Sequence, residues 1–149
     1  MTQTTTSKQQ IELLAPAGDS EAMRAAVANG ADAVYFGLAN FNARHRADNL
    51  AGESLRETLR YLHLHNVRGY VAFNTLIFPD ELEQAQQSII EIAESGADAV
   101  IIQDLGILYL IGLMAPSLQR HASTQMTLSD ARGIEVVTAM KRRRKAALA

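Results

Sequence analysis

The chain has 149 residues, of which 48% are hydrophobic and 20% are charged, a composition typical of one globular domain with its own core. The absence of cysteine excludes disulfides and thiolate metal ligands in this chain. The net charge of −2 hides an asymmetry, because residues 141–145 carry five of the 14 lysines and arginines, whereas residues 1–140 carry all 16 acidic residues.

Charge and polarity divide the chain into three predicted segments. We expect residues 1–10 to be flexible, residues 11–140 to fold, and the basic tail 141–149 to be disordered in solvent. A second interpretation of the tail is a contact with RNA, because lysine and arginine neutralise phosphates. The longest apolar run, 105–115, is too short to span a bilayer, so we expect a cytoplasmic protein with no membrane partner.

Short apolar runs alternate with segments of helical periodicity along the folded part. Buried strands are predicted at residues 11–15, 33–36, 67–73, 99–102 and 118–122. Helices are predicted at 19–29, 53–65 and 105–114, after Pro79, and from about Ser129. The sequence at 29–34 recurs at 95–100, and in both copies a glycine is expected to end a helix just before a strand.

The periodicity also predicts which helix residues face the core. The inward stripes are Met23, Ala26 and Val27; Leu55, Leu59 and Leu62; Leu82, Ala85, Ile89 and Ile92; and Ile134 and Val137. Residues 80–83 match a capping box, which predicts the start of the third helix. The helix at 105–114 is apolar on nearly all sides, so we expect either a central, buried helix or a surface covered by a partner or a missing part.

Five strands that alternate with five helices predict an α/β fold with a parallel sheet and right-handed crossovers. Such a sheet either closes into a barrel or stays open and doubly wound. A complete barrel of eight βα units needs about 200–250 residues. The chain has room for about five units, so it is either a compact open sheet or a barrel cut after its fifth unit.

Polar residues follow the carboxyl ends of the predicted strands, where ligand sites gather in parallel α/β proteins. Gly18 allows the backbone to approach a ligand closely. Asn42 and Arg44 lie in a long loop, where Arg44 can clamp a carboxylate or phosphate, or pair with a nearby acid. Neutral amides such as those of Asn74 and Gln103 suit a heteroaromatic ring or a peptide group, because each offers a donor and an acceptor.

Alternate positions at the last strand carry His121, Ser123 and Gln125, which face the same side if the strand persists. A hydrolase interpretation makes His121 the base, Ser123 the nucleophile and Asp104 the residue that orients the histidine. Against it, residues i and i+2 of a strand stand about 6–7 Å apart, too far for a hydrogen bond. The alternatives are a cluster of polar ligand contacts, hydrogen-bonded inner-barrel residues, and a helix cap for Asp104. The four histidines lack metal-ligand spacing, so no metal site is predicted.

Six motifs occur in order along the chain: LAPAG at 14–18, AVYFG at 33–37, FNAR at 41–44, NTL at 74–76, IQDLG at 102–106 and HASTQM at 121–126. Together they resemble the amino-terminal half of the collagenase-like peptidase family, from about Glu12 to Val137. The resemblance implies a partial TIM-type (β/α) barrel from a parent two or three times longer. The motifs also add Tyr35 and Thr124 to the residues expected to contact substrate.

Members of that family are labelled peptidases or collagenases, which makes a truncated peptidase the leading prediction. Other members are associated with oxygen-independent hydroxylation of a pyrimidine in ribosomal or transfer RNA, or of a quinone precursor. Several hold an iron–sulfur cluster through cysteines that follow the segment resembled here. The alternative is therefore an iron–sulfur-dependent hydroxylase. Without cysteine, this chain holds no such cluster, and we expect little or no turnover from it alone.

A third alternative is a non-enzymatic interaction module. The predicted partial barrel has an open edge with unpaired strand backbone. Either a second copy of the chain or the missing C-terminal half of a parent would cover that edge. The sequence leaves the substrate open between a peptide, an RNA base and a quinone precursor.

Overall fold

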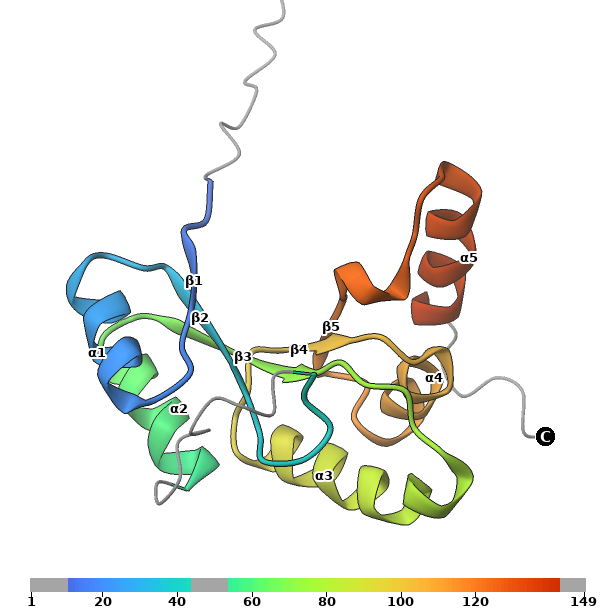
Figure 1. Cartoon of the computed structure of the whole chain (residues 1–149), viewed down its shortest axis with the longest axis horizontal. Helices are drawn as coiled ribbons and strands as arrows, with labels where there is room; N and C mark the ends of the chain where they lie inside the picture. The colour runs from blue at the N-terminus through green and yellow to red at the C-terminus, as the bar shows by residue number, and fades with distance from the viewer. Residues whose placement is uncertain (1–10, 44–53, 143–149) are drawn as a thin grey trace, which may run out of the picture.

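Five parallel strands form one sheet in a computed structural model that describes residues 11–43 and 54–142 (Figure 1). The strands follow the chain in the order β1-β2-β3-β4-β5, and each pairs in parallel with the next. Their bounds are β1 Leu14–Pro16, β2 Ala33–Gly37, β3 Arg68–Phe73, β4 Ala99–Ile102 and β5 Gln119–Ala122. The register places Tyr35 opposite Tyr70, and Ile101 opposite His121.

A helix follows each strand, as the alternating pattern predicts. The helices are α1 Ser20–Ala28, α2 Leu55–Leu64, α3 Leu82–Glu94, α4 Leu105–Met114 and α5 Ala131–Arg142. Two short 3-10 helices, η1 Pro79–Glu81 and η2 Thr124–Met126, precede α3 and α5. None of the helices in the described ranges combines the length and the apolar character that crossing a bilayer requires.

The arrangement of the helices decides between the two predicted architectures. Helices α1 to α4 lie on one face of the sheet, and α5 packs on α4 (Figure 1). A doubly wound sheet carries helices on both faces and reverses its strand order at a switch point. Sequential strand order with helices outside is the geometry of a barrel. The predicted partial (β/α) barrel of five βα units is therefore confirmed.

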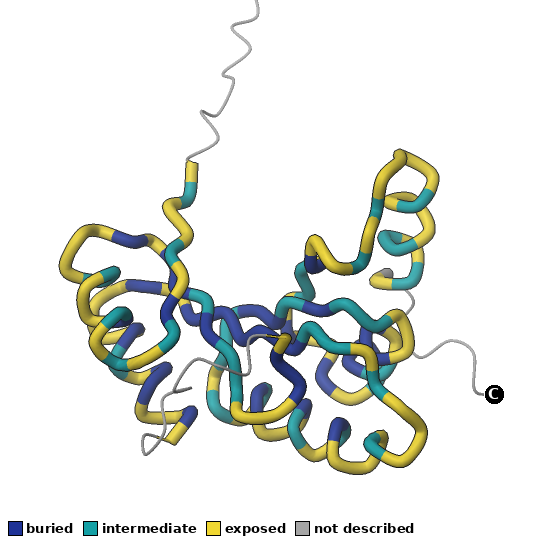
Figure 2. The backbone as a smooth tube through the Cα atoms, viewed as in Figure 1, coloured by how far each residue is buried: buried dark blue, intermediate teal, exposed yellow. Residues whose placement is uncertain are grey.

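Alternation along the strands divides the sheet into a helix-covered face and an open face. Val34, Phe36, Val71, Phe73 and Ile102 point to the helices and are fully or almost fully buried in the main core. Figure 2 shows buried backbone concentrated in the middle of the sheet. The opposite face carries a smaller cluster formed by Ala33, Tyr35, Tyr70, Ala99 and Ile101. In a closed barrel this second face is the interior.

The repeated segment has a structural role at the turns that enter β2 and β4. Gly30 and Gly96 adopt φ of 85° and 88°, which glycine tolerates and which ends the preceding helix. The aspartate two residues later then accepts a backbone N–H at the start of the neighbouring strand or from the residue just before it. Asp32 Oδ2 lies 2.7 Å from the Leu13 nitrogen, and Asp98 Oδ2 lies 2.8 Å from the Gly69 nitrogen.

Three details of the predicted elements are wrong. The first strand starts at Leu14, and Ile11 is 92% exposed, because the ladder with β2 begins at the pair Leu14 and Ala33. The predicted capping box at 80–83 is replaced by η1, where Glu81 Oε2 accepts the Phe78 N–H at 2.9 Å. The tighter 3-10 turn changes the phase of the helix that follows, which leaves Leu82 exposed.

The inward stripe of α5 is also shifted from the prediction. Val137 and Met140 pack against the core, whereas Ile134 is 54% exposed. Helix α4 buries Ile107, Leu108 and Ile111 but exposes Leu105, Tyr109 and Met114 on its other side, so it is not a fully buried central helix. Helix α5 continues to Arg142, into the predicted basic tail. Residues 1–10 and 143–149 lie outside the described residues, so the predictions for them remain predictions.

Candidate functional site

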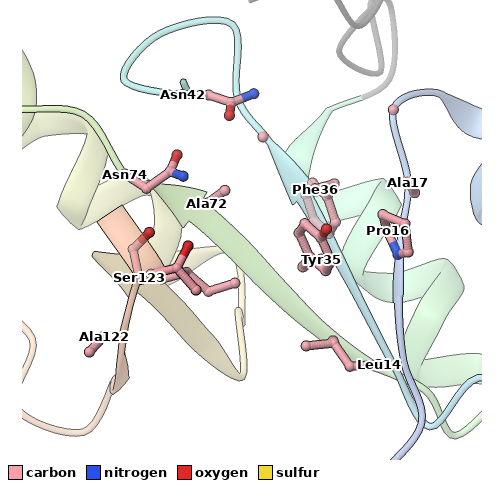
Figure 3. A pocket seen from close by; sticks show the side chains of 14 residues that line it. Leu14, Pro16, Ala17, Tyr35, Phe36, Asn42, Ala72, Asn74, Ala122 and Ser123 are labelled. Atoms are coloured by element: carbon pink, nitrogen blue, oxygen red, sulfur yellow. The ribbon is translucent and has the colours of Figure 1, made fainter. Parts of the chain in front are cut away.

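A pocket of about 360 Å³ opens at the carboxyl ends of the strands, on the open face of the sheet (Figure 3). Its volume falls within the range of small-molecule sites, about 300–1,000 Å³. All five strands and the loops after four of them contribute to the lining, which consists of Leu14, Pro16, Ala17, Gly18, Tyr35, Phe36, Gly37, Asn42, Ala72, Asn74, Ile101, Ala122, Ser123 and Thr124. The pocket thus gathers Gly18, Tyr35, Asn42, Asn74, Ser123 and Thr124 from the predicted site.

The loop after β2 brings the Asn42 side chain against Gly37. Asn42 is 4% exposed, and a Cβ at position 37 would lie 1.7 Å from its Nδ2 atom and 2.2 Å from its Cγ atom. Only glycine leaves room for the amide there. The preceding Phe41 adopts φ of 60°, and its ring packs on Phe73 with centroids 4.9 Å apart. The loop is therefore seated on the end of β3.

Asn74 ties the same loop to β3 with two hydrogen bonds. Its backbone N–H donates to the Phe41 carbonyl at 3.0 Å. Its side-chain Oδ1 accepts the Ala43 N–H at 3.3 Å. These contacts hold the asparagine at the lip of the pocket, where Figure 3 shows its amide.

Ser123 continues β5 into the 3-10 turn η2. Its N–H donates to the Ile102 carbonyl at 2.8 Å, and its Oγ accepts the Gln125 N–H at 3.2 Å. The residue is only 8% exposed and lines the pocket. The serine is both a turn cap and a pocket residue.

The three residues of the hydrolase interpretation each have other partners. The His121 ring meets the Tyr70 ring edge-on, with centroids 5.0 Å apart and an interplanar angle of 83°. Asp104 Oδ1 accepts the Ile107 N–H at 2.9 Å, so Asp104 caps α4. Within the described part of the chain, no hydrogen bond joins His121, Ser123 and Asp104. Their catalytic assignment stays a prediction.

A second pocket of about 560 Å³ holds the other predicted rim residues. Gln103, Asp104 and Gln125 line it together with apolar residues, including Leu76 from the loop after β3, Met126 from η2 and Val136 from α5. The predicted rim is therefore divided between two neighbouring pockets. Arg44 lies outside the described residues.

A polar cluster that the sequence did not predict lies on the open face of the sheet. The Tyr70 hydroxyl donates to the Glu12 carboxylate, at 2.9 Å from Oε1 and 3.0 Å from Oε2, and Arg68 forms an ion pair with Glu12. Burial and the hydrogen bond to Glu12 raise the pKa of Tyr70 to about 12. In the sequence, this cluster is indicated only by Arg68 and Tyr70, which occupy alternate positions of one strand and so share a face. Glu12 could not be assigned to the cluster, because it lies more than 50 residues away in the sequence.

Burial controls the charge of His121 beside that cluster. Desolvation lowers the pKa of His121, and the positive charge of Lys141 lowers this pKa further. Glu12 acts in the opposite direction and Arg68 in the same direction as Lys141. The net effect favours the neutral form of the imidazole.

The side chains of this chain limit which metal ions or cofactors it can bind. In the described ranges, no group of three or more histidine, cysteine, aspartate or glutamate side chains is placed to bind a metal ion. The whole chain lacks cysteine, so it offers no thiolate to the iron–sulfur cluster that the family resemblance implies. The residues present do not fit such a cluster.

Comparisons with known proteins agree on one family. The model of Peptidase family U32 matches residues 18–146. The chain is 42% identical over 121 residues to the 23S rRNA 5-hydroxycytidine synthase of Escherichia coli, covering 81% of this chain and 18% of that protein. It is 37% identical over 117 residues to tRNA hydroxylation protein P of Helicobacter pylori, covering 78% and 28%. It is 30% identical over 125 residues to a collagenase of Porphyromonas gingivalis, covering 83% and 30%.

The chain thus spans less than a third of the length of these relatives. Among solved structures, a U32 peptidase superposes with a TM-score of 0.73 at 8% identity, covering 94% of this chain and 59% of the other, which shows the common fold. The resemblance inferred from the six motifs is confirmed. Because the family model matches most of its length, this chain belongs to Peptidase family U32.

Proposed function

We propose that this chain forms the base-binding part of a barrel that hydroxylates a pyrimidine in RNA. Two relatives support this function by name, one a 5-hydroxycytidine synthase acting on 23S rRNA and one a tRNA hydroxylation protein. The relative named a collagenase is less similar, at 30% identity against 42% for the synthase. The RNA-modifying alternative is therefore favoured over the peptidase.

The lining of the pocket at the strand ends is the observation that carries the proposal. The described lining residues include amides, hydroxyls and an aromatic ring but no charged side chain. A neutral heteroaromatic base suits such a lining, because amides and hydroxyls supply directed hydrogen bonds and apolar groups contact its faces. A serine-type peptidase needs its serine within hydrogen-bond reach of a base, and Ser123 has no such partner among the described residues.

The proposal assigns binding to this chain and leaves the oxidation to the rest of a longer enzyme. Placing a hydroxyl group on a ring carbon removes two electrons from the base. The chain has no cysteine to hold an iron–sulfur cluster. We therefore assign no redox step to any residue described above.

A chimera tests the proposal. The segment of the E. coli synthase that aligns with this chain is replaced by the chain's own residues, and 23S rRNA from a strain lacking the native synthase is analysed by mass spectrometry. We expect 5-hydroxycytidine in the strain with the chimera and in the control strain with the intact synthase. An expressed chimera that restores nothing contradicts the proposal.

A second measurement keeps the proposal testable if the chimera does not fold. The purified 149-residue chain is titrated with cytidine and observed by backbone NMR. We expect shift changes at Ala17, Tyr35, Asn74 and Ser123. The opposite result is cleavage of a collagen-derived peptide by the chain with loss of cleavage in Ser123→Ala, which would establish the peptidase instead.

A further inference from the structure

We infer that the second pocket binds the base of a nucleotide next to the one held in the pocket at the strand ends. The inference rests on the proposed function and extends it from one base to two successive nucleotides of the same RNA strand. It depends on how the two pockets adjoin and on which chemical groups line the second one.

The two pockets meet along the turn η2. Thr124 lines the pocket at the strand ends, and the next residue, Gln125, lines the second pocket. Consecutive Cα atoms are about 3.8 Å apart, so the pockets adjoin at this turn. At the end of β4, Ile101 lines the pocket at the strand ends, and Gln103 lines the second pocket about 6–7 Å further along the chain. An RNA strand whose base enters the pocket at the strand ends therefore brings an adjacent nucleotide to the second pocket.

The walls of the second pocket are mainly aliphatic. Leu76, Leu105 and Val136 line it and are each between 45% and 59% exposed. Apolar side chains that are exposed together in a groove mark a binding site. Met126 adds a polarisable thioether, which makes favourable contacts with aromatic rings. The flat face of a nucleobase would cover this apolar surface.

The charge of the second pocket favours a base over a phosphate. The described lining residues include no lysine, arginine or histidine, and Asp104 is the one carboxylate among them. Its Oδ1 accepts the Ile107 N–H at 2.9 Å, which holds the negative charge at the start of α4. A phosphate there would be repelled. In a nucleotide, the base is the group that is uncharged and has large apolar faces, so the sugar–phosphate backbone is expected to lie outside this pocket.

Two carboxamides complete the second pocket. Gln103 and Gln125 line it, and in the described part of the chain neither side-chain amide forms a hydrogen bond. Each amide offers a donor and an acceptor, so the pair can contact the polar edge of a base. Proteins bind unstacked RNA bases with this combination, in which side chains cover the faces and hydrogen bonds form at the edges.

Titration of the complete 149-residue chain with three RNA ligands tests the inference, observed by backbone NMR. The ligands are cytidine, the trinucleotide 5′-ACA-3′, and a trinucleotide that has cytidine between two abasic residues and so keeps both phosphates. We expect all three to shift the signals of Ala17 and Asn74, and only ACA to shift those of Gly106 and Gly133, which line the second pocket. ACA should bind at least about tenfold more tightly than the abasic trinucleotide, a difference of about 1.4 kcal/mol.

A pair of variants on α5 locates the contact. Val136 lines the second pocket and is 58% exposed, whereas Ile134 is 54% exposed and lies outside its lining. Val136→Asp and Ile134→Asp add the same charge to the same helix, so a general repulsion of RNA is common to both. We expect Val136→Asp to lose most of the tenfold advantage of ACA and Ile134→Asp to keep it. Circular dichroism of both variants confirms that the fold is kept, and the ligand series needs no variant.

The possible outcomes separate this inference from the proposed function. If the abasic trinucleotide binds as tightly as ACA, or if the two variants behave alike, the inference is overturned while base binding at the strand ends stands. Shifts of Gly106 and Gly133 that depend on protein concentration without RNA would assign the second pocket to another copy of the chain, and would also overturn the inference. If none of the three ligands binds, the base-binding function fails with it.

Discussion

At the scale of single residues, the same side chain often accepts a backbone hydrogen bond and also lines a pocket. Asn74, Ser123 and Asp104 each accept a backbone N–H within their own loop or turn. These hydrogen bonds satisfy backbone N–H groups in the turns that would otherwise be unpaired. The need for such an acceptor is enough to explain why asparagine, serine and aspartate occur at these positions, even if no ligand binds. Asn74 and Ser123 also line the pocket at the strand ends, and their contact with a substrate stays a prediction.

His121 carries a prediction on pH. Its pKa is lowered in the folded chain, chiefly by burial and next by Lys141. As the pH falls below the unfolded value of about 6.5, the unfolded state takes up a proton before the folded state does. The free energy of unfolding should therefore fall between pH 7 and pH 5, and it should fall less in His121→Gln.

Urea unfolding followed by circular dichroism at both pH values measures this difference. The other three histidines are unchanged in the variant, so a difference between the two curves is due to position 121. Tyr70, Glu12, Arg68 and Lys141 are the groups that act on His121, and all are retained in the variant. An equal pH dependence in the two proteins would show that burial of this imidazole does not oppose its protonation.

At the scale of elements, the turn from a helix into the next strand is built in the same way three times. Gly30 and Gly96 adopt positive φ after α1 and α3, and Asn66 adopts φ of 57° after α2. The repeat in the sequence revealed the two glycines but not Asn66, because an asparagine in the left-handed region has no fixed signature. Nor could the sequence reveal that Asp32 and Asp98 accept a backbone N–H beside the start of the neighbouring strand, because this contact depends on register.

Asp98 carries the prediction for these turns. Its Oδ2 accepts the Gly69 N–H at 2.8 Å and lies 2.9 Å from His63 Nε2. Asp98→Ala leaves the N–H at the start of β3 without this acceptor, and we expect a loss of about 1–3 kcal/mol in the free energy of unfolding. Asp98→Asn keeps an oxygen at the same place and should lose less. Chemical denaturation measures both, and an Asp98→Ala variant as stable as the native chain contradicts the role.

Most elements could be predicted from local pattern, and the errors have physical causes. The stripe Leu55, Leu59 and Leu62 is buried as predicted, because three turns of regular α-helix keep one face. The predicted inward positions are wrong at Leu82, where a 3-10 turn leads directly into the helix, and at Ile134, where packing against α4 sets the rotation of α5. The pocket followed from the convergence of parallel strand ends, but the fit of Asn42 on Gly37 did not, because it arises from a loop conformation.

At the scale of the whole molecule, one core joins both ends of the sheet. The main cluster of buried residues runs from Met23 on α1 to Ile111 on α4 through the helix-facing residues of β2, β3 and β4. Burying an apolar face between sheet and helices is the main source of stability in such a layer. The open face adds a smaller cluster around Tyr70. The helices and strands therefore share one core even though the barrel has five units.

A shared core predicts that the chain unfolds in a single cooperative transition. Met23 and Ile111 are almost fully buried and lie on helices over opposite ends of the sheet. Met23→Ala and Ile111→Ala should each lower the free energy of unfolding by about 2–5 kcal/mol. Each should shift the transition seen by far-ultraviolet circular dichroism and that seen by tyrosine fluorescence by the same amount, because a cooperative domain loses helices and tertiary packing together. If Met23→Ala instead separates the two transitions, the α1 end of the sheet unfolds on its own and the core is not continuous.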